Sequence, residues 1–181
     1  KISSSQFNDL KLIKDILKKN RPLLISTGMS DIKEINALSK FLRNKSNVIF
    51  MHCISKYPLK DTEANLKMIG VIKKITKGIV GYSDHTKDTL CCEIAAILGA
   101  KIIEKHYSFD NKRKGFDHKI SLNFESFKKM VKNIRYLEKM IGNVKQNNEI
   151  KNSKKVSRQK RSYFLNKDLK KGYRIKLKDI F

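Results

Sequence analysis

The stretch IVGYSDHTKDTLCCEIAAILGAKIIEKHY, residues 79 to 107, contains two short β-branched runs separated by a segment of helical character. Strands covered on both faces read as continuous apolar runs, and residues 79–82 and 101–104 fit that description. Between them apolar residues recur with a helical period from Leu90 to Leu98, and Gly99 is placed to end the helix. A strand, a helix and a second strand joined by short connections predict parallel strands with a right-handed crossover.

The same alternation extends toward the amino terminus. Further apolar runs lie at residues 23–27 and 48–53, and apolar residues at helical spacing follow each of them. Such consecutive units fit either an open doubly wound sheet or part of a (β/α)8 barrel, and both folds place their chemistry at the carboxyl ends of the strands. No G-x-G-x-x-G follows a strand and no Walker-type Gly-Lys-Ser/Thr is present, so we favour the barrel.

Several helix ends are marked by their own residues. Asp31 with Glu34 three positions later predicts a helix start, and Asn8 is expected to cap the helix before the first strand. Near the end of this region an amphipathic helix is expected from residue 123, with Gly142 closing it.

The length of the chain limits how much of a barrel it holds. A complete barrel takes about 250 residues, whereas this chain has 181. We therefore expect residues 1–142 to form the carboxyl-terminal portion of a TIM barrel, residues 143–159 a basic linker, and residues 160–181 the start of another domain. The first residues read as the tail of a strand, so we expect an excerpt that lacks the amino-terminal strands.

The formal net charge of +24 invites a nucleic-acid-binding hypothesis, because lysine and arginine neutralise phosphates. Yet only seven of the 41 basic residues are arginine, the side chain whose planar fork suits base and phosphate recognition. The lysines are spread over every predicted helix, which is typical of a solvated surface. The run from Lys151 to Arg161 is an exception, and we interpret it as a linker. A nucleic-acid partner is the weaker alternative.

The cysteines and the hydropathy indicate the cellular compartment that we expect for this chain. There are three cysteines, an odd number, and Cys91 and Cys92 are adjacent, where a bridge between them would be strained. No C-x-x-C pair indicates a structural zinc site. No apolar stretch approaches the ~20 residues that span a bilayer. We expect a reduced, cytoplasmic protein with no membrane partner.

Two histidines occupy equivalent places at the ends of neighbouring strands, His85 after one run and His106 after the next. An isolated strand-end histidine is ordinarily a hydrogen-bonded structural residue, and we interpret His52 in that way. Neighbouring strands would bring His85 and His106 close together. Two neutral imidazoles that leave coordination positions open suit a divalent metal acting as a Lewis acid.

Five segments carry a family resemblance. They are LLISTGMS (23–30), HCISKYP (52–58), VGYSDHT (80–86), GAKIIEKH (99–106) and GFDHKISL (115–122). In their order and spacing they resemble the sialic acid synthase family, also called the N-acetylneuraminate synthases. Residues 160–181 resemble the opening of the antifreeze-like (SAF-type) β-clip domain that follows the barrel in that family. The segment at 115–122 has Phe116 where the family usually has proline, and some members carry asparagine at the position of Ser55.

The resemblance implies a transferase that condenses phosphoenolpyruvate with an N-acetylated amino sugar, such as N-acetylmannosamine, to a nine-carbon 2-keto acid and phosphate. It implies a divalent metal, Mn²⁺ or Mg²⁺, held by His85 and His106, and a homodimer at full length. The positions that match phosphoenolpyruvate-binding residues are Lys1, Ser4, Ser26, Ser55 and Ser83. Tyr57, Glu104 and Asp117 match positions that meet the amino sugar. Glu104 is the expected catalytic residue, and the alternative is that it orients His106 or the metal's bound water.

Some alternatives stay open at the level of sequence. The sialic, legionaminic and pseudaminic branches share the phosphate and metal positions and differ mainly in loops. We expect Lys112 to Lys114 to form a solvated loop. The 181 residues alone are expected to be inactive because missing strands would carry further substrate contacts, and an inactive remnant is an alternative to a functional enzyme.

Overall fold

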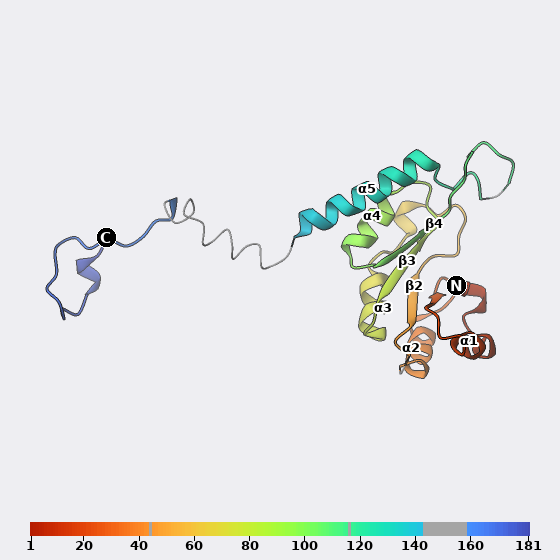
Figure 1. The fold of residues 1–181 in the computed structure, drawn as a ribbon, viewed down its shortest axis with the longest axis horizontal. Coiled ribbons are helices and arrows are strands. Elements are labelled where there is room, and N and C mark those ends of the chain that lie inside the picture. Colours follow the sequence, from red (N-terminus) through yellow and green to blue (C-terminus); the bar gives the residue numbers. More distant parts are fainter. Residues whose placement is uncertain (44, 116, 143–158) are drawn as a thin grey trace. The chain divides into compact units, whose positions relative to one another are not determined.

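The computed structural model describes residues 1–43, 45–115, 117–142 and 159–181. It divides into two compact units, residues 1–141 and residues 142–181 (Figure 1). The first unit alternates strands and helices. Its helices are α1 (Leu10–Leu17), α2 (Ile32–Phe41), α3 (Met68–Thr76), α4 (Leu90–Ile97) and α5 (Phe124–Ile141), with short 3-10 helices at Ser4–Gln6 and Asp61–Glu63. Its strands are β1 (Leu23–Ser26), β2 (Val48–His52), β3 (Val80–Asp84) and β4 (Ile102–Lys105).

The strands form one parallel sheet in the order β1-β2-β3-β4, so each strand lies beside the next one in the sequence. In the register of β3 with β4, Ser83 lies opposite Glu104 and Asp84 lies opposite Lys105. Ile2 makes a parallel bridge to Ile25 of β1, so the first residues add to the sheet as the tail of a strand would. The predicted α/β fold with a parallel sheet is confirmed.

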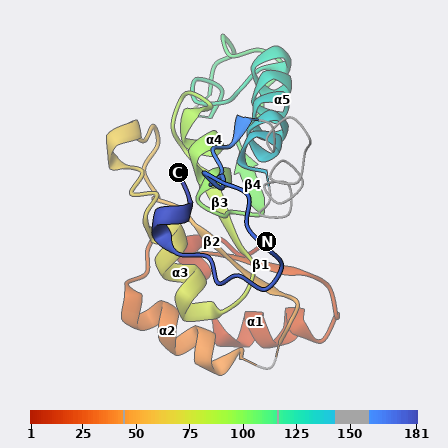
Figure 2. The same ribbon diagram turned by 90° about the vertical axis from the view of Figure 1, so that its left-hand side faces the viewer.

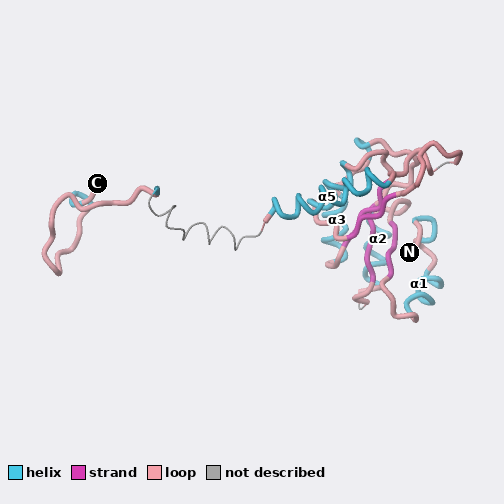
Figure 3. Tube along the Cα trace, turned by 45° about the horizontal axis from the view of Figure 1, so that its top comes forward, coloured by secondary structure: helices cyan, strands magenta, loops and turns pink. Residues whose placement is uncertain are grey.

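Helices pack along the sheet in chain order. Helix α3 contacts β2 and β3, and α4 contacts β3 and β4, while α2 packs against α3 and α5 packs against α4 (Figure 2). Figure 3 shows the strands in magenta running side by side in this unit. Within the described residues, none of the helices has both the length and the apolar character that crossing a bilayer requires.

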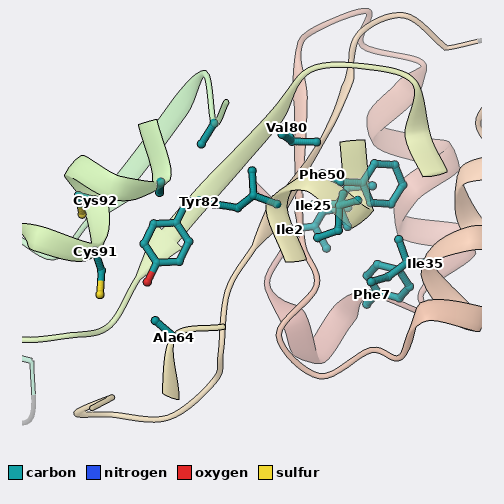
Figure 4. Packing of buried hydrophobic residues seen from close by; sticks show 14 of the residues in the cluster. Ile2, Phe7, Ile25, Ile35, Phe50, Ala64, Val80, Tyr82, Cys91 and Cys92 are labelled. Carbon is teal, nitrogen blue, oxygen red and sulfur yellow. The ribbon is translucent and has the colours of Figure 1, made fainter. Parts of the chain in front are cut away.

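The core lies between the sheet and its helices. Ile25, Phe50 and Val80, from three consecutive strands, are buried together with Phe7 and Ile35 (Figure 4). Full burial of a side chain of this size contributes about 1.5–3 kcal/mol relative to exposure. The strands that carry the site are therefore held by a continuous apolar layer.

The predicted helix starts differ in their outcome. At α2, Asp31 and Glu34 form a reciprocal capping box, as predicted. At α1 the prediction of Asn8 as the cap is wrong, because the carboxylate of Asp9 accepts the backbone N–H of Leu12 at 2.9 Å. The Asn8 amide instead donates to Glu34 at 3.1 Å.

The second unit is described from residue 159 onward, so most of the predicted linker, residues 143–158, lies outside the described residues. The sequence predicts alternating strands around the turn at Gly172. The turn is present, but the described residues on either side of it form no extended strand: Leu165 meets Ile180 in a single antiparallel bridge. A 3-10 helix occupies Leu177–Asp179. Backbone hydrogen bonds join Phe164 and Phe181 in both directions, and the Asn166 N–H donates to the Asp179 carbonyl at 3.0 Å.

Candidate active site

Strand alternation decides which residues can form a site. Successive residues of a strand point to opposite faces, so Ser83 and His85 share one side, as do Glu104 and His106 on the neighbouring strand. Asp84 faces the other way, toward the helices, where its carboxylate contacts the Cys92 thiol of α4 at 3.3 Å. At the carboxyl ends of the strands, one set of side chains therefore faces the cavity and another faces the helices.

A cavity of about 360 Å³ lies at the carboxyl edge of the sheet. Its lining includes every residue that the sequence assigns to the site except Asp117. These are Lys1, Ser4, Ser26, Ser55, Tyr57, Ser83, His85, Glu104 and His106. The structure therefore gathers residues that are up to 105 positions apart, from Lys1 to His106, around one space.

The two histidines lie next to each other, with ring centroids 5.6 Å apart. His85 is 5% exposed, and its Nδ1 lies 2.7 Å from the carbonyl oxygen of Ile54. With Nδ1–H donating to that carbonyl, the Nε2 lone pair is left available. The Tyr57 ring packs over His85, with centroids 4.1 Å apart.

Protonation also suits His85 to metal binding. Burial lowers the pKa of His85, and the nearby His106 lowers it further, so the imidazole stays neutral below its ordinary range. The neutral form is the one that binds metals. Within the described residues no cluster of three or more His, Cys, Asp and Glu side chains gathers as a ready-made metal site. Two imidazole donors with further positions open nevertheless fit a metal that must also bind substrate oxygens.

Glu104 joins two of the side chains assigned to phosphoenolpyruvate. Lys1 Nζ donates to its two oxygens at 2.6 and 2.8 Å, and Ser83 Oγ donates to Oε1 at 2.8 Å. Although burial acts to raise the pKa of Glu104, hydrogen bonds from Lys1 and Ser83 outweigh it and lower that pKa. The carboxylate is therefore ionised and holds both donors at the cavity.

Asp117 lies beside the cavity and not in its lining. Its Oδ2 is 3.8 Å from Nδ1 of His106, on the loop that follows β4. Phe116, the residue that departs from the family pattern, lies outside the described residues. The predicted sugar residue is thus close to the histidine pair but borders it from the solvent side.

Several lining residues were not identified from the sequence. They are Ser3, Ser5, Gln6, Met29 and Cys53. Cys53 is buried, and its thiol lies 3.2 Å from the Ser4 hydroxyl, which accepts the backbone N–H of Gly28 at 3.0 Å. A Cβ at Gly28 would lie 2.6 Å from both Cys53 Sγ and Ser55 Oγ, so a larger residue there would require these side chains to shift. The available signal was position alone: these residues lie at the ends of predicted strands or just after them.

The sequence also gave no indication of a buried ion pair behind the histidines. Lys105 Nζ lies 2.7 Å from Asp84 Oδ2, and both side chains are 0% exposed. Asp84 also accepts the Tyr82 hydroxyl at 2.8 Å and the Thr86 hydroxyl at 2.8 Å. Burial acts to raise the pKa of Asp84, but the charge of Lys105 and the hydrogen bonds to the carboxylate outweigh it, so that pKa is lowered and the carboxylate is ionised.

The ion pair holds both strand ends that carry the histidines. Besides Asp84, Lys105 Nζ donates to the backbone carbonyl of Thr86. Asp84 and Thr86 flank His85, and Lys105 precedes His106. Lys105, the residue before His106, therefore contacts both residues that flank His85 in the chain.

His52 differs from the pair and has a structural environment. It is 2% exposed, its Nε2 lies 2.9 Å from the carbonyl oxygen of Ala64, and its ring stacks on Tyr82 with centroids 5.7 Å apart. Burial lowers the pKa of His52 below the ordinary value of 6.5.

This environment predicts a pH dependence of stability. Below pH 6.5 the unfolded chain takes up a proton on His52 while the folded chain does not. His52 should therefore not reduce the free energy of unfolding above that pH. As the pH falls further, this free energy should decrease by up to roughly 1.4 kcal/mol per pH unit for one group. In urea titrations, H52Q should reduce this slope, and H52Q/H85Q should reduce it further because the pKa of His85 is lowered too. An unchanged slope in both variants would contradict the assignment.

Known proteins share much of this sequence. Residues 1–146 match the model of the NeuB family. The N,N'-diacetyllegionaminic acid synthase of Campylobacter jejuni is 35% identical over 176 residues, which are 95% of this chain and 53% of that protein. The N-acetylneuraminate-9-phosphate synthase of Drosophila melanogaster is 34% identical over 131 residues, which are 71% of this chain and 35% of that protein.

A solved structure is similar to this chain in both sequence and fold. The crystal structure of an N-acetylneuraminic acid (sialic acid) synthetase from Leptospira borgpetersenii, in complex with citrate, is 31% identical with a TM-score of 0.74. The match covers 85% of this chain and 57% of that one. The chain thus spans about half the length of the first curated relatives it matches.

Proposed function

The chain belongs to the NeuB family, and from this we propose that the complete protein condenses phosphoenolpyruvate with an N-acetylated amino sugar. The products would be a nine-carbon 2-keto sugar acid and phosphate. The observation that carries the proposal is the single cavity in which Lys1, the serines, Glu104 and the histidine pair converge. The relatives named as synthases of legionaminic acid and of N-acetylneuraminate 9-phosphate support it.

The phosphate of phosphoenolpyruvate would bind at the serine-rich side of the cavity. An ammonium and several hydroxyl donors at short range suit a phosphate group. Lys1 and Ser83 are already oriented by their contacts with Glu104. Ser4, Ser26 and Ser55 complete the donors on this side.

The sugar would bind at the histidine side, between Tyr57 and Asp117. We propose that His85 and His106 hold Mn²⁺ or Mg²⁺, which would polarise the sugar aldehyde as a Lewis acid. The hydrogen bond from His85 to the Ile54 carbonyl orients the ring for this role. Asp117 and Glu104 offer carboxylate oxygens to sugar hydroxyls.

The reaction then balances with one water molecule. The methylene carbon of phosphoenolpyruvate attacks the aldehyde carbon and forms the new carbon–carbon bond. Water adds to the resulting cationic carbon, and phosphate leaves with cleavage of the carbon–oxygen bond. Low-dielectric walls around the buried strand ends strengthen the interactions of the fixed charges.

The complete protein would add what this chain lacks. We propose that further strands close the sheet into a TIM barrel, that residues 160–181 open an antifreeze-like domain, and that the protein is a cytoplasmic homodimer. The parallel order of the strands and the three free cysteines support parts of this description. Without the additional strands we expect the 181-residue chain to release no phosphate.

The test is phosphate release by the complete protein from phosphoenolpyruvate. With Mn²⁺, we expect release when N-acetylmannosamine or one of its 2,4-diacetamido relatives is supplied, and no release without sugar or after chelation. Absence of release with any of these sugars would overturn the proposal. A titration with duplex and single-stranded DNA over a range of salt concentrations tests the alternative, because binding through phosphates falls steeply with salt.

A further inference from the structure

Three segments of the chain meet at one corner of the candidate active-site cavity. Ser4 belongs to the 3-10 helix before α1, Gly28 follows β1, and Cys53 follows β2 directly. Ser4 and Cys53 both line the cavity. We call these three residues the thiol corner. It lies on the side of the cavity where the phosphate of phosphoenolpyruvate is proposed to bind.

Backbone hydrogen bonds hold the segments of the thiol corner against one another. The N–H of Ser26 donates to the Ile2 carbonyl at 3.1 Å, and the N–H of Thr27 donates to the Met51 carbonyl at 3.0 Å. The Thr27 hydroxyl donates to the same carbonyl at 3.1 Å. Each of these residues lies within two positions of a member of the corner. The side chains of the corner therefore project from a fixed backbone.

The Ser4 hydroxyl has two partners in the thiol corner. Its Oγ accepts the backbone N–H of Gly28 at 3.0 Å and lies 3.2 Å from Cys53 Sγ. The packing is tight, because a Cβ at Gly28 would lie 2.6 Å from Cys53 Sγ and 3.0 Å from Ser4 Oγ. Cys53 is buried, whereas Ser4 is half-buried. Ser4 is therefore the member of this pair that a substrate can reach more readily, and the thiol lies behind it.

The number of protons on these groups limits how they can pair. A hydroxyl group has one proton to donate and two lone pairs that accept. The Gly28 N–H occupies one lone pair of Ser4 Oγ. When the Cys53 S–H occupies the other, the Ser4 proton is left to donate into the cavity. The opposite arrangement, in which Ser4 donates to sulfur, is weaker because sulfur is a poor acceptor and a charged phosphate oxygen is a strong one.

We propose that Cys53 is a positioning residue for phosphoenolpyruvate, whose S–H donates to Ser4 Oγ and thereby turns the Ser4 proton toward the substrate phosphate. The inference rests on the proposed function, since the phosphate must lie on the serine side of the cavity. The oxygens of an ionised phosphate only accept hydrogen bonds, so a hydroxyl held as a donor suits them. The thiol acts through Ser4 and need not contact the substrate.

The test measures binding of phosphoenolpyruvate to the complete protein by titration calorimetry, together with KM for each substrate in phosphate release. C53A should weaken phosphoenolpyruvate binding about threefold to tenfold, as expected for one net hydrogen bond. KM for the sugar should stay within roughly twofold, whereas a general structural defect would change both values. C53S keeps a donor at this position and should recover part of the affinity.

Cys91 provides a matched control, because it is another buried thiol, on α4, and is not part of the cavity lining. C91A should keep the affinity for phosphoenolpyruvate. Full affinity in C53A, an equal loss in C91A, or a C53S variant that binds no better than C53A would overturn the inference. In each of these cases phosphate release by the unmodified protein would leave the proposed function intact.

A double-mutant cycle tests whether Cys53 acts through Ser4. S4A should itself weaken phosphoenolpyruvate binding, and S4A/C53A should bind no more weakly than S4A, because the hydroxyl that the thiol orients is already gone. Losses that add in the double variant would overturn the inference, since the thiol would then act independently of Ser4. No phosphate release by the unmodified protein with any sugar would overturn the proposed function and this inference together.

Discussion

Replacing His85 or His106 with glutamine in the complete protein is expected to reduce metal-dependent phosphate release by about a thousandfold or more. A Lewis-acid metal contributes several kcal/mol to such a reaction, and each ~1.4 kcal/mol is a factor of ten in rate. Glutamine is similar in length and uncharged, but it removes the imidazole nitrogen that would bind the metal. Titration calorimetry with Mn²⁺ should show the loss of affinity directly.

His52 provides the matched control for these variants. It is also a buried histidine at the end of a strand, and it also contacts a backbone carbonyl, that of Ala64. H52Q should reduce the loss of stability as the pH falls and leave Mn²⁺ affinity within roughly twofold. If H85Q bound Mn²⁺ as tightly as H52Q, the assignment of the histidine pair to the metal would be wrong.

The contrast between these histidines shows how far the sequence could be used. The apolar runs predicted the strands, and strand order followed from short connections, so the edge at which polar residues gather was predictable. The equivalent positions of His85 and His106 after consecutive runs then predicted their proximity, and in the structure their ring centroids lie 5.6 Å apart. Backbone periodicity and covalent adjacency determine these features, and both can be read from the chain.

The partners of charged residues could not be predicted in this way. Lysine is almost never fully buried unless paired, and nothing in KIIEKHY distinguishes Lys105 from the exposed Lys101. The pairing of Lys105 with Asp84 depends on the register between β3 and β4, which the sequence does not state. The sequence predicts that Lys112 to Lys114 are solvated and misses the cavity that they line, because three loops have to meet around Tyr57 to form it.

Replacing Lys105 with methionine is expected to destabilise the first unit by about 3–5 kcal/mol, the cost of removing one partner of a buried ion pair. The Asp84 carboxylate, which has no exposed surface, would lose its compensating charge. Methionine fills similar space, so little of the loss should come from a cavity. Because Lys105 also holds the Thr86 carbonyl beside His85, Mn²⁺ affinity should fall by about 10–100-fold, as for other groups that orient metal ligands.

Two comparisons separate the ion pair from general effects of substitution. K101M removes an exposed lysine just before β4 and should leave both the unfolding midpoint and Mn²⁺ affinity unchanged. D84N/K105M removes both charges, so it should recover much of the stability that K105M loses, and the double-mutant cycle gives the coupling between the two side chains. Mn²⁺ affinity should stay low in the double variant, since the contact with the Thr86 carbonyl is still missing. Equal unfolding midpoints for K105M and K101M would show that the pair contributes nothing to the fold, and full Mn²⁺ affinity in K105M would show that it does not position the histidines.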